Sequence, residues 1–109
     1  GLPDGPVRTM HARYGVPGAN GSYPWARHFD RFDVAKHPNE AFRHGWVIEF
    51  DPYDPNSMPK KRTALGRFRH EGCTIQVARN GKVVGYMGDD ERFEFMYKYV
   101  SNGTYNPFD

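Results

Sequence analysis

Side chains that could do chemistry gather in two short motifs in the C-terminal half of the chain. The first is RHEG at residues 69–72, and the second is GDDER at residues 88–92. Three consecutive carboxylates repel one another, and a hard cation such as Ca²⁺ removes that repulsion by taking several oxygen ligands. The alternative is a pair of solvated turns, in which Arg67 or Arg69 balances Glu71 and Arg92 partly neutralises the acidic triplet. The residues alone leave both interpretations open.

The two motifs meet if the residues between them form a β-hairpin. Residues 74–78 and 83–88 have the composition of strands, and the Asn-Gly pair at 80–81 supplies the left-handed backbone of a tight turn. Pairing about this two-residue turn places Glu71 opposite Asp90, and Gly72 opposite Asp89. Gly72 also permits close approach of another backbone. The hairpin therefore predicts one carboxylate cluster at one end of a sheet.

The elements that must position this cluster are short strands. The sequence predicts strands at residues 46–50, 61–68, 74–78, 83–88 and 94–100, the last of them crossing to a neighbouring sheet. Asp, Asn and Pro at residues 51–57 predict a firm turn after the first strand. This spacing is typical of all-β sandwiches, barrels and propellers.

The N-terminal third has little periodicity. Residues 11–14 are expected to end a short helix that Gly15 and Pro17 stop, and residues 17–22 read as a mobile loop. A long irregular stretch is unusual in a small domain. We therefore expect residues 1–45 to pack along a larger body, and residues 46–109 to form the antiparallel β segment.

Composition narrows the class of protein. The 109 residues carry 15 Lys+Arg and 13 Asp+Glu with no basic half or acidic tail, so neither a nucleic-acid nor a membrane-surface partner is indicated. No apolar run reaches transmembrane length. The single cysteine, Cys73, excludes an intramolecular disulfide and is best interpreted as a core thiol rather than a nucleophile. The five histidines lack zinc-ligand spacing.

Four motifs, in order and at compatible spacing, resemble the PhoX-type bacterial alkaline phosphatases. They are GWVIEFDPYDP at residues 45–55, KRTALGRFRHEG at 61–72, YMGDDER at 86–92 and YKYVS at 97–101. Shorter similarities at residues 31–34 and 38–40 extend the resemblance over most of residues 25–109. The resemblance implies a β-propeller, of which this chain would form about one blade. It also implies hydrolysis of phosphate monoesters with calcium and iron, in a protein exported to the periplasm or secreted.

The resemblance also implies roles for individual residues. It makes Glu71, in the His-Glu-Gly motif, a metal ligand that fixes the metal rather than acting as an acid or base. Asp89, Asp90 and Glu91 would be calcium ligands or groups beside the calcium. Arg92 would orient a carboxylate or help to hold phosphate.

The match also departs from the family pattern. The family's iron-binding cysteine lies upstream of the matched segment, so Cys73 does not inherit that role. A later glutamate and a later arginine of the family's site lie downstream of the segment. We therefore expect a fragment of a larger all-β enzyme that is inactive alone and that dimerises through exposed strand edges. One alternative is a non-enzymatic, calcium-stabilised propeller or binding module. Another is a hydrolase of different specificity on the same scaffold.

Overall fold

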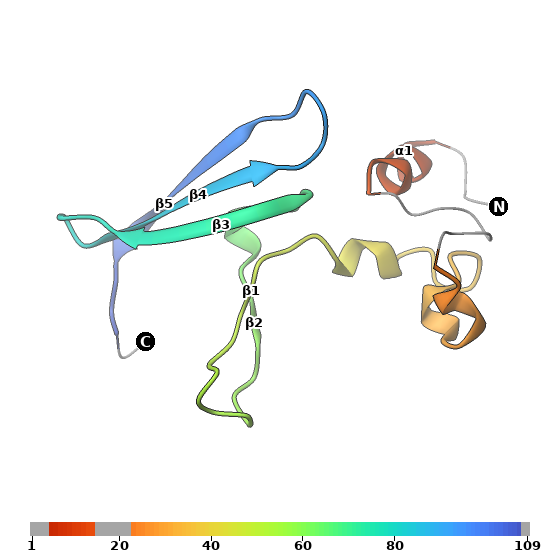
Figure 1. Ribbon diagram of the computed structural model, residues 1–109, viewed down its shortest axis with the longest axis horizontal. Helices are drawn as coiled ribbons and strands as arrows, with labels where there is room; N and C mark the ends of the chain where they lie inside the picture. The colour runs from red at the N-terminus through yellow and green to blue at the C-terminus, as the bar shows by residue number, and fades with distance from the viewer. Residues whose placement is uncertain (1–4, 15–22, 108–109) are drawn as a thin grey trace. The chain divides into compact units, whose positions relative to one another are not determined.

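The structure is a computed structural model that describes residues 5–14 and 23–107. The chain divides into two compact units, an N-terminal unit at residues 1–45 and a C-terminal unit at residues 46–109. Short helices make up the described part of the N-terminal unit, and strands dominate the C-terminal unit (Figure 1). The sequence-predicted loop at residues 17–22, with Gly15 and Pro17, lies outside the described residues.

The N-terminal unit begins with helix α1 (Pro6–Arg13), whose first-turn proline needs no hydrogen-bond partner for its nitrogen. The predicted helix end at residues 11–14 is confirmed, because Tyr14 is the C-cap. His11 is buried: its Nε2 donates to the Pro38 carbonyl at 2.9 Å, and its ring stacks on Phe42 at 5.5 Å. This histidine therefore packs α1 against residues near the end of the unit.

Three 3₁₀ helices complete the described part of this unit. They are η1 (Trp25–Arg27), η2 (Asp30–Phe32) and η3 (Glu40–Arg43). The largely buried Glu40 carboxylate accepts hydrogen bonds from the Arg31 guanidinium at 2.6 and 3.0 Å, and it lies 3.5 Å from Arg43 and 3.8 Å from His44. A carboxylate tolerates burial when cations pair with it. These contacts fix η3 to η2.

The C-terminal unit contains two antiparallel sheets (Figure 1). Strands β1 (Ile48–Glu49) and β2 (Lys60–Lys61) pair as a short hairpin arm. Strands β3 (His70–Val77), β4 (Lys82–Asp89) and β5 (Met96–Thr104) form a sheet in the order β3-β4-β5. The predicted all-β class is confirmed. The predicted crossing of the last strand to another sheet is wrong, because β5 pairs directly with β4.

The predicted strand at residues 61–68 is also wrong beyond Lys61. Residues Thr63–Leu65 form a 3₁₀ helix, η4, and Gly66 follows it with φ at 83°. This turn brings Leu65 and Phe68 inward, where they form a small buried core with Met87 from β4. Burying these apolar side chains stabilises the unit, which is a physical reason for the chain to turn here.

Three partly buried residues pack against this core: Val47, Cys73 and Tyr99. The interpretation of Cys73 as a core thiol agrees with this placement, and burial raises the pKa of its thiol. A raised pKa lowers the thiolate fraction at neutral pH, and the thiolate is the nucleophilic form. Cys73 is therefore poorly suited to attack a substrate.

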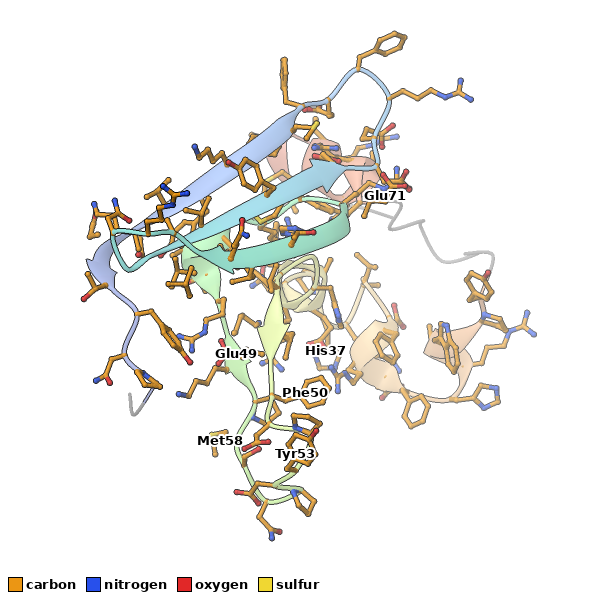
Figure 2. All side chains as sticks on the ribbon, turned by 60° about the vertical axis from the view of Figure 1, so that its left-hand side comes forward. His37, Glu49, Phe50, Tyr53, Met58 and Glu71 are labelled. Carbon is orange, nitrogen blue, oxygen red and sulfur yellow. The ribbon has the colours of Figure 1, made fainter. Side chains whose placement is uncertain are left out.

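The loop of the β1–β2 arm is built from the predicted turn residues. The Asp51 carboxylate accepts a hydrogen bond from the Tyr53 N–H at 2.9 Å, and Asp54 accepts one from the Asn56 N–H at 3.0 Å. Such bonds let Asp side chains stabilise turns locally. Three apolar side chains around this loop are exposed: Phe50, Tyr53 and Met58 (Figure 2).

The β3–β4 turn corrects the predicted register by one residue. The Ala78 N–H donates to the Lys82 carbonyl at 2.9 Å, so the loop has three residues, 79–81. A two-residue Asn-Gly turn needs positive φ at both positions. Gly81 has φ at 78°, but Phe93 is the only non-glycine residue in the described ranges with positive φ, so Asn80 does not. Gly72 consequently pairs with Gly88 rather than Asp89.

We expect Gly81→Ala to destabilise the C-terminal unit by about 1 kcal/mol, because alanine is strained at this φ. Its Cβ would also lie 3.2 Å from Thr104 Cγ2. Gly72→Ala is the matched control, since no described atom lies within 4 Å of a Cβ there. Urea unfolding followed by circular dichroism measures both variants, and equal midpoints would contradict the assigned turn.

Candidate metal site

Glu71 lies at a β-bulge at the start of β3. His70 pairs with Asp89 and Gly72 pairs with Gly88, so Glu71 is the extra residue on its strand. The predicted direct pairing of Glu71 with Asp90 is therefore wrong, because the three-residue turn and this bulge shift the register. Bulges re-aim side chains, and Figure 2 shows Glu71 at the end of the three-stranded sheet.

The Glu71 carboxylate is exposed and has no hydrogen bond or ion pair with the residues that the structure describes. Its Oε2 atom lies 4.0 Å from the position that a Cβ would take on Gly88. The Glu71 carboxylate therefore lies over Gly88 of β4, at a distance that is ordinary van der Waals contact. An exposed carboxylate without a protein partner keeps its oxygens available to a ligand.

His70 anchors the chain immediately before Glu71. Its ring stacks on Phe68 with 3.6 Å between ring centroids, and its Nε2 donates to the Gly66 carbonyl at 3.2 Å. Phe68 also lies 4.7 Å from the Tyr97 ring on β5. The imidazole therefore holds the bulge to the core of the unit, a structural role that the sequence did not indicate.

The acidic turn is tied to the same end of the sheet. The Asp90 N–H donates to the Arg69 carbonyl at 2.9 Å, and the Asp89 N–H donates to the Phe95 carbonyl at 3.3 Å. Asp89 Oδ1 accepts a hydrogen bond from the Glu91 N–H at 3.1 Å. The structure thus brings the two sequence motifs together, as the hairpin predicts, although through different pairs.

Arg69 forms an ion pair with Glu91, and one guanidinium nitrogen lies against the carboxylate. The sequence suggested Arg67 or Arg69 as a partner of Glu71, and Arg92 as a residue that partly neutralises the acidic turn. Arg92 instead extends into solvent, and its guanidinium has no polar partner in the described parts of the chain. Of the four candidate ligands, Glu91 is therefore already engaged, whereas the exposed Asp90 carboxylate has no described partner.

The family model for alkaline phosphatase PhoX matches residues 3–109. The chain belongs to the PhoX alkaline phosphatase family. A solved structure of Pseudomonas fluorescens PhoX in complex with vanadate, a transition state analogue, has a TM-score of 0.82 and 51% sequence identity to it. The match covers 95% of this chain and 17% of that chain. Among curated proteins, none matches significantly.

These comparisons confirm the resemblance inferred from the motifs and identify the strands as part of a PhoX β-propeller. The chain spans about a sixth of the Pseudomonas protein. Within the described residues, no helix is long and apolar enough to cross a membrane.

The donor atoms at this end of the sheet suit a hard cation in part. Carboxylate oxygens are the ligands that Ca²⁺ prefers, and Glu71 and Asp90 offer them without a competing described partner. Across residues 5–14 and 23–107, however, no three His, Cys, Asp or Glu side chains converge as a metal site. The described residues thus offer the unengaged carboxylates of Glu71 and Asp90, and a cation site here would need further donors to complete its coordination.

Proposed function

We propose that this chain is a segment of a metal-dependent phosphatase that hydrolyses phosphate monoesters in the periplasm or after secretion. The observation that carries the proposal is the exposed Glu71 carboxylate, re-aimed by the bulge, in the His-Glu-Gly motif of a PhoX chain. The Pseudomonas fluorescens PhoX was solved with vanadate, a transition state analogue. This agrees with phosphoryl-transfer chemistry in the intact protein.

The side chains would divide the work as follows. Glu71 binds a metal, which we assign to the calcium and iron set of the family. Asp90 and Asp89 contribute oxygens to calcium, and Glu91, held by Arg69, supports them from beside the ion. Bound metals neutralise phosphate oxygens and position the attacking group. Arg92 provides a mobile positive charge for phosphate or for one of these carboxylates.

Alone, the 109-residue chain should be inactive. The described residues hold no group of three metal ligands, and the chain corresponds to 17% of the Pseudomonas protein. We expect no turnover of 4-nitrophenyl phosphate above the buffer rate in the presence of calcium and iron. Pseudomonas fluorescens PhoX serves as the positive control. Turnover that co-purifies with the chain would contradict the proposal.

Alternatives remain for the same acidic turn. In a non-enzymatic propeller or binding module, calcium would stabilise the turn without any reaction. A hydrolase of another specificity would use the same ligands on a different ester. The first alternative predicts that the intact protein hydrolyses no phosphomonoester although calcium raises its stability, and the second predicts hydrolysis of esters other than phosphomonoesters.

We also propose that the isolated chain dimerises. Strands β3 and β5 are the edges of their sheet, and β5 is nine residues long and mostly exposed. Unpaired edges are templates for pairing with another chain. Light scattering at micromolar concentration should give about twice the monomer mass. A monomer at all concentrations would refute this expectation.

A further inference from the structure

Phe93, in the loop between β4 and β5, occupies a strained position. The Glu94 N–H donates to the Glu91 carbonyl at 3.2 Å, so residues 91–94 form a β-turn with Phe93 at its third position. Phe93 has φ at 69°. Glycine or asparagine normally occupies such a position, because a Cβ clashes with the backbone there. A phenylalanine at this φ raises the free energy of the turn.

The same residue is 99% exposed, so its ring gains nothing from the rest of the chain as described. Phe95 at 68% and Met96 at 80% are exposed beside it in the sequence. We call Phe93, Phe95 and Met96 the loop apolar cluster. Strain and exposure both disfavour a phenylalanine here, and a contact outside the chain would offset both.

The loop apolar cluster follows directly after the acidic turn. Glu91 begins the β-turn that carries Phe93, and its carboxylate is paired with Arg69. Asp90 is held at its backbone by the Arg69 carbonyl. Fixing the Phe93 ring would therefore fix the far end of the loop, and with it the directions in which these carboxylates point.

We propose that the loop apolar cluster docks into the portion of the PhoX fold outside these 109 residues, and that this contact holds the acidic turn in its metal-binding arrangement. The proposal rests on the proposed function, in which the chain is a segment of a longer enzyme. Its support is the comparison: the matched segment is 17% of the Pseudomonas structure, so most of that fold is available to cover the cluster.

A second copy of the chain is a less suitable partner for this cluster than the rest of the PhoX fold. A stable dimer buries on the order of 1,200–2,000 Å² in total. Three side chains between the loop and the first residue of β5, interrupted and flanked by Glu94 and Arg92, fall well short of that area. One aromatic anchor in a pocket of a larger body needs no such extended surface.

The test uses a PhoX chimera, in which these 109 residues replace the matching segment of Pseudomonas fluorescens PhoX. Phe93→Ala removes the ring but keeps the strain, and Phe93→Gly removes both. Phe93→Tyr keeps an aromatic ring. In the chimera, we expect Phe93→Gly and Phe93→Ala to lower the melting temperature and to weaken calcium retention by about 10-fold or more. Phe93→Tyr should behave like the parent.

In the isolated 109-residue chain, Phe93→Gly should instead raise the urea midpoint, because only relief of strain remains. Phe93→Gly would then destabilise the chimera but stabilise the isolated chain. This difference in sign distinguishes docking from a local effect of the substitution. If the Phe93→Gly chimera is as stable as its parent and retains as much calcium, the proposal is overturned. It is also overturned if Phe93→Ala only converts a dimer of the chain to a monomer.

These readouts are independent of catalysis. A chimera that loses calcium and stability on Phe93→Ala, yet never hydrolyses phosphomonoesters, would sustain the docking proposal and refute the proposed function. If the Phe93→Ala chimera is insoluble, the solubility of the Phe93→Tyr chimera tests the docking proposal instead. Soluble Phe93→Tyr protein supports docking of the ring, and equal insolubility of both variants counts against it.

Discussion

Glu71→Gln in the PhoX chimera should lower kcat/KM for 4-nitrophenyl phosphate by about 100-fold or more. The amide keeps the size of the side chain but removes its negative charge, and the affinity of a calcium site depends on the number of charged ligands. On the proposed function, the metal neutralises the phosphate in the transition state, so losing it would remove several kcal/mol of stabilisation. Steady-state kinetics together with metal content by mass spectrometry measure the effect.

Glu49→Gln is the matched control, because it makes the same chemical change at a carboxylate in the β1–β2 arm. Glu49 pairs with Arg62 at 2.6 Å, and that hydrogen bond lowers the pKa of the Glu49 carboxyl. The pair is exposed, so its loss should cost under about 1 kcal/mol of stability and leave activity within about twofold. Full activity and metal content in the Glu71→Gln chimera would refute the metal role of Glu71.

Phe68→Ala should unfold the C-terminal unit or leave it barely folded. Phe68 is 7% exposed and is one of three buried apolar residues in the core. Its ring stacks on His70 and lies tilted against the Tyr97 ring. Removing a buried aromatic ring costs about 3–5 kcal/mol. The free energy of unfolding of a small domain is only about 5–15 kcal/mol in total. Because the ring also supports His70, the bulge at Glu71 should lose its fixed position.

Phe50→Ala is the control for Phe68→Ala, since Phe50 is 65% exposed in the β1–β2 arm. We expect it to change the unfolding free energy by about 0.5 kcal/mol or less. Thermal melts by circular dichroism and dispersion of amide signals by NMR distinguish the two variants. Similar losses from both would show that the three-residue core does not hold the unit together.

The sequence predicted the strands that carry the site better than those around it. The predicted strand at residues 83–88 lies within β4, because an apolar run bounded by turns is a local signal. The strand predicted at 61–68 is wrong beyond its first residue, because Leu65 and Phe68 turn toward Met87. Met87 lies far from both residues in the sequence. Local propensity contains no information about that partner.

At the site, the sequence placed both acidic motifs at one end of a hairpin but missed how they are held. Asn-Gly fits loops of two or three residues, and the absence of positive φ at Asn80, together with the Ala78–Lys82 hydrogen bond, shows that the loop has three. The bulge at Glu71 and the Arg69–Glu91 ion pair both depend on that choice. Phe93 could not be foreseen, because a phenylalanine is not a residue that predicts left-handed backbone. The metal roles came from family resemblance.

Anomalous diffraction from crystals of the PhoX chimera, at energies that separate iron from calcium, tests the central claim most directly. We predict a metal peak about 2.0–2.6 Å from a Glu71 carboxylate oxygen, with further ligands from residues outside the 109. Metal peaks elsewhere in the chimera, with Glu71 extended into solvent and bound to none of them, would contradict it.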